Sequence, residues 1–295
     1  MITRRAVLGG LLAGASAPAF AEAIERSPVP PPRPGKGKAA AAAGDAGRSA
    51  RLVEAAKLGG ATGFVVLDAA TGAVLEARAA DVPMPPASVA KAMTSLYALD
   101  RLGGRFRFAT RVLATGPIEA GMVQGDLILA GGGDPTLQTD QLGDLVARLA
   151  KSGLRGVTGR FSYWDAGLPG LPYVAADQPV HVGYNPAIAG LNLNFNRVNF
   201  EWTRDSGGGW TVAVDARGER FLPAVDLVRV AVVDRKVPLF TYEPGATREG
   251  WTVASAALGK AGSRWLPVRH PGLYTAEVFR TQGTGQGRCQ SSRPR

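Results

Sequence analysis

The sequence predicts a mixed α/β protein in which a hairpin and a helix precede a long region made mostly of strands. Three observations predict this class. Apolar, β-branched residues flank a turn within residues 64–78, an apolar helical face follows at 89–102, and strand-like runs separated by Gly and Pro come after Phe106. With 295 residues and 45% hydrophobic side chains, the chain is long enough for a sizeable core and about two domains.

Composition narrows the range of functions. The net charge of +10 is interpreted as an evenly basic surface, which would also suit an anionic polymer in a cell-wall setting. No run of interleaved aromatic and basic residues predicts a nucleic-acid-binding face, so no nucleic acid partner is expected. His181 and His270 are too few for a His-rich metal site, and Cys289 cannot form an internal disulfide. No metal or organic cofactor is expected.

The N-terminus has the pattern of an export signal. The basic residues Arg4 and Arg5 precede an apolar run that ends at Ala17, and a small-x-small cleavage site ends at Ala21. Residues 1–21 are therefore predicted to be a signal peptide, and the arginine pair resembles a twin-arginine signal, with a plain Sec signal as the alternative. Both routes predict a periplasmic protein without a transmembrane segment after signal removal.

Residues 22–50 are predicted to be a linker. A proline-rich stretch from Pro28 to Pro34 favours stiff, extended chain, and an alanine tract at 39–43 lacks an apolar partner face.

A hairpin and a helix follow the linker. Phe64–Asp68 and Ala73–Arg78 are predicted strands that flank a turn ending in Thr71-Gly72. Val89–Leu102 is a predicted helix that two glycines end.

The remaining region is predicted to contain strands and two helices. The helices are expected at Leu142–Lys151 and at Pro271–Arg280, with Pro271 in the first turn of the second. The strands are expected at Arg111–Thr115, Asp126–Ala130, Gly159–Trp164, Arg197–Thr203, Gly209–Asp215, Leu227–Val233, Trp251–Ala254 and Trp265–Val268.

The chemistry of the chain is expected at Ser88 and Lys91. Two residues three apart on a helix share a face, so this spacing puts an amine beside a hydroxyl. Serine becomes a good nucleophile only when a base removes its proton, and a lysine can be that base when its surroundings favour the neutral amine. The helix N-terminus would favour the negative charge that develops in acyl transfer. The alternative is that Ser88 only caps the helix.

Three blocks carry a resemblance to a known family. The first joins Asp68-x-x-Thr-Gly72 to Pro86-Ala-Ser-Val-Ala-Lys91, the second is the Gly-Gly-Gly-Asp-Pro-Thr run within 125–137, and the third is 267–279. With them, residues 50–281 resemble the penicillin-binding D-alanyl-D-alanine carboxypeptidase/endopeptidases, in the class with a large insert after the nucleophile helix.

The resemblance implies a fold and a function. It implies a partial core like that of the serine β-lactamases and transpeptidases, a sheet packed with helices, together with a β-rich inserted domain. Residues 51–110 would begin the core, 111–255 would form the insert, and 256–281 would return to the core. Ser88 would be the acylated nucleophile and Lys91 its base. The substrates would be peptidoglycan stem peptides ending in D-Ala-D-Ala, and beta-lactams would be covalent inhibitors.

Two family motifs are not found. No Ser-x-Asn occurs in the sequence, and Lys151-Ser152-Gly153, which spells the Lys-Ser/Thr-Gly motif, is predicted to end a helix instead. Residues 282–295 form an atypical polar tail that is either disordered or, as we prefer, the mark of a truncation or frameshift. A catalytically incomplete relative that binds cell wall or protein is therefore the alternative function. A β-lactamase is disfavoured by the large insert.

Asp134, the two histidines and the asparagine-rich segment are predicted to have structural roles. Asp134 is predicted to bond the backbone of a tight turn, and the glycines before it are not a P-loop because no Lys-Ser/Thr follows. Neither histidine has a spacing that supports a triad with Ser88. The asparagine-rich segment 185–199 is predicted to be a surface loop, with a peptide-binding groove as the alternative.

Overall fold

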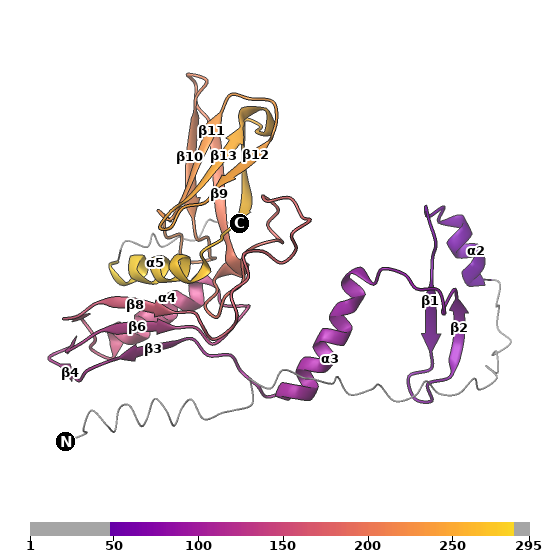
Figure 1. Cartoon of the computed structure of the whole chain (residues 1–295), viewed down its shortest axis with the longest axis horizontal. Helices are drawn as coiled ribbons and strands as arrows, with labels where there is room; N and C mark the ends of the chain where they lie inside the picture. Colours follow the sequence, from indigo (N-terminus) through magenta and orange to yellow (C-terminus); the bar gives the residue numbers. More distant parts are fainter. Residues whose placement is uncertain (1–47, 286–295) are drawn as a thin grey trace. The chain divides into compact units, whose positions relative to one another are not determined.

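The computed structural model describes residues 48–285, which form two compact units divided between Arg101 and Leu102 (Figure 1). The predicted signal peptide, the linker up to residue 47 and the tail from residue 286 lie outside the described residues. The domain division made from the sequence stays a prediction.

The first unit contains the predicted hairpin and nucleophile helix. Strands β1 and β2 pair antiparallel, and a short 3-10 turn leads into α3. Helix α2, which the sequence analysis did not predict, takes up the last residues assigned to the linker. The elements are α2 (Arg48–Ala55), β1 (Phe64–Leu67), β2 (Val74–Arg78), the 3-10 turn (Ala87–Val89) and α3 (Ala90–Leu102).

Asp68 closes the turn of the hairpin. Its Oδ1 accepts hydrogen bonds from the backbone N–H of Ala70 and from both the N–H and the hydroxyl of Thr71, at 3.1, 2.7 and 2.7 Å. Gly72 has φ 71°, which favours glycine at this position. The hydrogen bond from the Thr71 hydroxyl is the main reason that the pKa of Asp68 lies below its ordinary value.

Many apolar side chains of the first unit are exposed. On α3, Met93 is 70% and Leu96 63% exposed, and on the hairpin Val65 is 46% exposed. A two-stranded hairpin alone is only marginally stable in water, so most of the buried core must be sought in the second unit.

The second unit holds two long helices and three larger sheets. Its helices are α4 (Thr139–Lys151) and α5 (Pro271–Gly283). Its strands are β3 (Arg111–Ala114), β4 (Ile118–Glu119), β5 (Met122–Val123), β6 (Leu127–Ala130), β7 (Gly156–Val157), β8 (Phe161–Trp164), β9 (Arg197–Arg204), β10 (Trp210–Asp215), β11 (Val228–Val233), β12 (Phe240–Glu243), β13 (Glu249–Ala254) and β14 (Ala261–Pro267).

Helices α4 and α5 lie beside one sheet of this unit (Figure 1). In that sheet β6 is central, antiparallel to β3 and parallel to β8. Phe161 of β8 stacks on Phe279 of α5, with ring centroids 5.5 Å apart. The short strands β4, β5 and β7 form a small separate sheet.

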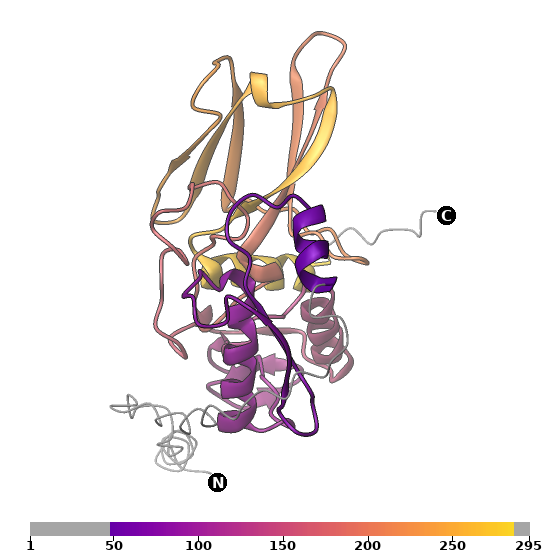
Figure 2. The same cartoon turned by 90° about the vertical axis from the view of Figure 1, so that its right-hand side faces the viewer.

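The other two sheets lie together at one end of the unit (Figure 2). Strand β9 pairs antiparallel with β10 and β14, while β13 pairs parallel with β11 and antiparallel with β12. Each strand and helix predicted for the second unit is present, and the strands β4, β5, β7 and β12 are additions. The mixed α/β class is confirmed. Residues 256–281 belong to the second unit, in which β14 pairs with β9 and α5 contacts α4.

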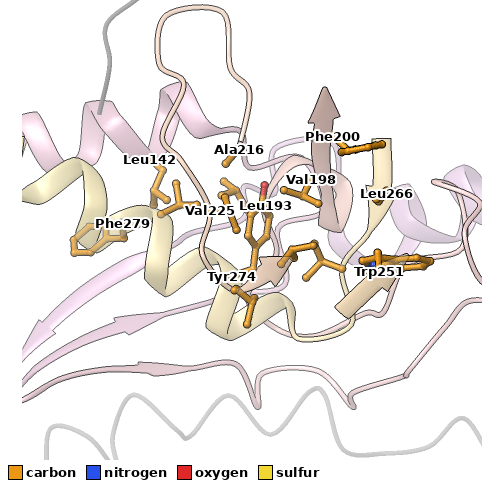
Figure 3. Packing of buried hydrophobic residues seen from close by; sticks show 14 of the residues in the cluster. Leu142, Leu193, Val198, Phe200, Ala216, Val225, Trp251, Leu266, Tyr274 and Phe279 are labelled. Atoms are coloured by element: carbon orange, nitrogen blue, oxygen red, sulfur yellow. The ribbon is translucent and has the colours of Figure 1, made fainter. Parts of the chain in front are cut away.

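The hydrophobic core of the second unit lies between α5, α4 and strands of its larger sheets. Figure 3 shows Tyr274 of α5 beside Leu193, between Leu142 of α4 and the β9 residues Val198 and Phe200. Each of these side chains is at most 1% exposed. A fully buried aromatic or Leu side chain contributes about 1.5–3 kcal/mol, so this cluster stabilises the second unit strongly.

Helix α4 ends at the Lys-Ser-Gly triplet. Gly153 has φ 88°, its N–H donates to the carbonyl of Ala150, and the N–H of Leu154 donates to the carbonyl of Leu149. This pair of bonds is the Schellman motif, which confirms Lys151-Ser152-Gly153 as a helix end.

The asparagine-rich segment is not a surface loop, and the prediction made for it is wrong. Asn192, Asn194 and Asn196 are 7%, 3% and 4% exposed. Asn194 bonds Thr139 at the start of α4 through both its amide oxygen and nitrogen, and Asn196 Nδ2 donates to the carbonyl of Ala187 at 2.8 Å. Asparagine is buried here because its amide satisfies backbone groups that no strand or helix partner reaches.

Candidate active site

Ser88 lies in the turn that begins helix α3. The 3-10 turn Ala87–Val89 is closed by a hydrogen bond from the N–H of Val89 to the carbonyl of Pro86, at 2.9 Å. Ala87 has φ 42°, which is uncommon for a residue other than glycine. The turn runs directly into α3 at Ala90, so Ser88 precedes the first turn of a 13-residue helix.

The structure brings Ser88 and Lys91 together. Lys91 Nζ lies 2.9 Å from Ser88 Oγ, within hydrogen-bonding distance, and both side chains are exposed. This is the distance that a nucleophile and its base require. The helix places the two residues on one face, as their spacing predicts.

The Gly-Gly-Gly-Asp-Pro-Thr block belongs to the second unit. Asp134 Oδ1 accepts hydrogen bonds from both the backbone N–H and the hydroxyl of Thr136, each at 2.8 Å, which confirms the predicted turn. The N–H of Gly131 bonds the carbonyl of Trp164, and the N–H of Gly133 bonds the carbonyl of Gly190. The glycines therefore allow close packing of backbone on backbone.

The two histidines have structural contacts. The ring of His181 stacks on Phe240 at 4.5 Å, and partial burial is the main reason that the pKa of His181 lies below its ordinary value. The backbone N–H of His270 donates to Glu249 Oε1. Within residues 48–285 neither imidazole hydrogen-bonds a carboxylate, which is the arrangement a triad needs.

Glu249, at the start of β13, is the most deeply buried carboxylate in the described part of the chain. Its side chain is fully buried, and Oε1 accepts the backbone N–H groups of Arg269 and His270, each at 2.8 Å. Among residues 48–285, no partner reaches Oε2. Burial raises the pKa of Glu249 above its ordinary value, although the two backbone N–H groups oppose the shift.

The raised pKa predicts a pH-dependent stability. A carboxyl that is harder to ionise when folded holds a proton that the unfolded chain has released, so stability falls as the pH rises above the ordinary glutamate value of 4.5. Glu249→Gln removes this titration. Urea denaturation of both proteins should therefore show the wild type losing stability relative to Glu249→Gln as the pH rises.

The neighbouring strand offers a control. Glu243, on β12, is exposed, so Glu243→Gln makes the same change of carboxyl to amide outside the buried site. Parallel profiles for the wild type and Glu249→Gln would show that the buried carboxyl does not titrate in this range.

The described part of the chain contains neither a cluster of metal ligands nor a membrane-spanning helix. No three His, Cys, Asp or Glu side chains gather closely enough among residues 48–285 to bind a metal ion. No helix in that part combines the length and the apolar character needed to cross a bilayer.

The chain belongs to the S13 peptidases, the D-Ala-D-Ala carboxypeptidase 3 family, whose model matches residues 49–282. The match spans both compact units.

Curated relatives share part of the sequence. A D-alanyl-D-alanine carboxypeptidase of Actinomadura sp. (strain R39) is 43% identical over 102 residues, 34% of this chain and 19% of that protein. A carboxypeptidase of Mycobacterium tuberculosis is 38% identical over 101 residues, 30% of this chain and 21% of that protein. The D-alanyl-D-alanine carboxypeptidase DacB of Haemophilus influenzae is 32% identical over 115 residues, 38% of this chain and 24% of that protein. The matched segments thus span a quarter or less of each relative.

Solved structures share the fold. Penicillin binding protein 4 from Haemophilus influenzae superposes with a TM-score of 0.58 and 22% identity, over 76% of this chain and 50% of that one. The same protein complexed with a novel beta-lactam gives a TM-score of 0.54. The predicted fold class agrees with this likeness.

Phe195 and Arg197 line a groove of the second unit. The sequence analysis gave a groove as the alternative for segment 185–199, but it did not single out either residue. The signal was present in the run from Leu191 to Asn196, in which apolar residues and asparagines alternate. Asparagine tolerates the left-handed conformation, so this run could have indicated an unusual turn.

Proposed function

We propose that this chain is a serine-type D-Ala-D-Ala carboxypeptidase/endopeptidase that acts on peptidoglycan stem peptides through an acyl-enzyme at Ser88. The observation that carries the proposal is the 2.9 Å separation of Lys91 Nζ from Ser88 Oγ at the start of α3. Membership of the D-Ala-D-Ala carboxypeptidase 3 family supports it.

In the proposed acylation, Lys91 takes the hydroxyl proton while Ser88 Oγ attacks the carbonyl carbon of the penultimate D-Ala. The bond from that carbon to the nitrogen of the terminal D-Ala breaks, and the departing amine takes the proton from Lys91. Water then cleaves the ester and restores the Ser88 hydroxyl. Beta-lactams would acylate Ser88 in the same way when their ring amide opens.

Covalent labelling with a fluorescent penicillin tests the proposal. Labelling is expected with residues 22–295 and should be lost in Ser88→Ala, because the ester cannot form without Oγ. Lys91→Met should slow labelling by a factor of about 10² or more, since general-base catalysis contributes that much.

Ser95 supplies the matched control, because it is an exposed serine within α3, the helix that follows Ser88. Ser95→Ala should label like the wild type. Absence of labelling in folded wild-type protein would contradict acylation by this chain. It would favour the alternative of a catalytically incomplete relative that binds cell wall or protein, which the missing Ser-x-Asn motif motivates.

We further propose that residues 1–21 direct export and that the mature protein acts in the periplasm. The basic pair, the apolar run and the small-x-small site support this assignment. The division into a core part at 51–110, an insert at 111–255 and a return at 256–281 is proposed on the same sequence basis.

A further inference from the structure

A strained turn in the second unit presents an aromatic side chain to solvent. Asn194, Phe195 and Asn196 have φ of 51°, 56° and 53°, so three consecutive residues are left-handed. This conformation is strained for side chains other than glycine and asparagine. The neighbouring asparagines are buried, whereas Phe195 is 47% exposed.

Buried hydrogen bonds hold the strained turn in place. The N–H of Asn194 donates to the carbonyl of Leu137 at 2.9 Å, and Asn196 Oδ1 accepts the N–H of Leu193 at 3.1 Å. Asparagine satisfies this conformation at two of the three positions, but a bulky aromatic at the third does not. Strain that the surroundings enforce at an exposed aromatic residue points to a functional site.

Phe195 lines an apolar groove of about 460 Å³. Val174 and Tyr184 line it too and are 57% and 69% exposed. The volume lies in the range of sites that take small molecules or peptide side chains. Exposed apolar side chains that gather around one groove are typical of binding surfaces.

A cation without an acidic partner completes the groove. Arg197 lines it, and its guanidinium carbon lies 5.2 Å from the ring centroid of Phe195 and 5.3 Å from that of Trp265. Its Nε donates weakly to the carbonyl of Asn194 at 3.5 Å. Within residues 48–285 no carboxylate forms an ion pair with it. Partial burial lowers the pKa of Arg197 from its ordinary value, as expected for an uncompensated cation.

We propose that this groove binds a peptide that carries an apolar side chain next to a free carboxylate. The apolar side chain would lie against Phe195 and Tyr184, and the carboxylate would accept hydrogen bonds from the Nη groups of Arg197. Contacts with two aromatic rings restrict the guanidinium of Arg197. A planar guanidinium can make a bidentate contact with a carboxylate. This site is independent of acylation at Ser88.

Chemical-shift titration of the ¹⁵N-labelled full chain tests the inference, with acetyl-leucyl-phenylalanine and its C-terminal amide as probes. The acid should bind about tenfold more tightly than the amide, the usual effect of one charge-assisted hydrogen bond. Arg197→Gln should bind the acid and the amide equally. Arg264→Gln is the matched control, because Arg264 stacks on Phe240 and does not line the groove, so it should retain the tenfold preference.

A variant at Phe195 separates binding from folding. Asparagine adopts the left-handed conformation readily, so Phe195→Asn should retain the Tm of the wild type while it weakens binding of the acid at least fivefold. A structural role alone would lower the Tm instead. Equal affinities of the wild type for the acid and the amide, or no saturable binding of the acid by folded protein, would overturn the proposal. Ser88→Ala should bind the acid as tightly as the wild type does. This result would show that binding in the groove does not depend on acylation, so the two proposals can fail independently.

Discussion

Gly131→Ala is expected to lower the free energy of unfolding of the second unit by about 3 kcal/mol. A Cβ at this position would overlap the carbonyl oxygen of Gly190 and the Cα of Leu191. Both atoms belong to backbone, which cannot move aside as the end of a flexible side chain can. The Gly131 backbone is also held by its hydrogen bond to the carbonyl of Trp164, so the strain must be absorbed by the packing of neighbouring segments.

Urea denaturation followed by tryptophan fluorescence measures this effect, because all 5 tryptophans of the chain lie in the second unit. Gly259→Ala is the control, since a Cβ there has no heavy atom within 4 Å and φ is not positive. It should change the free energy of unfolding by no more than about 0.5 kcal/mol. Similar values for the two variants would mean that the backbone at Gly131 has room that the structure does not show.

Asn196→Ala is expected to destabilise the same unit by about 3 kcal/mol. The change removes the donors to the carbonyl of Ala187 and to Asn192 Oδ1, and it leaves the buried N–H of Leu193 without its acceptor. It also places alanine at φ 53°, a conformation that is more strained for alanine than for asparagine.

Asn196→Gly distinguishes the two causes. Glycine adopts the positive φ without strain but supplies no hydrogen bonds, so it should be less destabilising than alanine by about 1 kcal/mol. The same tryptophan-monitored denaturation measures both variants. Loss of less than about 1 kcal/mol in Asn196→Ala would show that water replaces the buried hydrogen bonds.

Local interactions explain why much of the fold was predictable. The turn at Asp68, the helix after Ser88 and the end of α4 at Gly153 each depend on contacts between residues fewer than six positions apart. Turn chemistry, helical periodicity and the preference of glycine for positive φ are visible in such short windows. The same reason applies to the candidate active site, because two residues three apart on one helix meet without help from the rest of the fold.

Long-range contacts explain the failures. The segment around Asn194 was predicted to be a surface loop because it is polar. In the folded chain, however, Asn194 bonds Thr139 at the start of α4, and Asn196 bonds the carbonyl of Ala187. Nothing in the local sequence distinguishes an exposed asparagine from one that satisfies buried backbone groups. Strands β4, β5, β7 and β12 were missed because each is short, and β12 gains its order from pairing with β13.

The sequence by itself determined the class of fold, the family and the pairing of Ser88 with Lys91, because these depend on periodicity, turn residues and motif spacing. Only the tertiary structure decided that the asparagines are buried, that Glu249 is fully enclosed and that Arg197 contacts two aromatic rings beside an apolar groove. Burial and the absence of an acidic partner depend on which distant segments pack around a side chain, and a linear sequence does not contain that information.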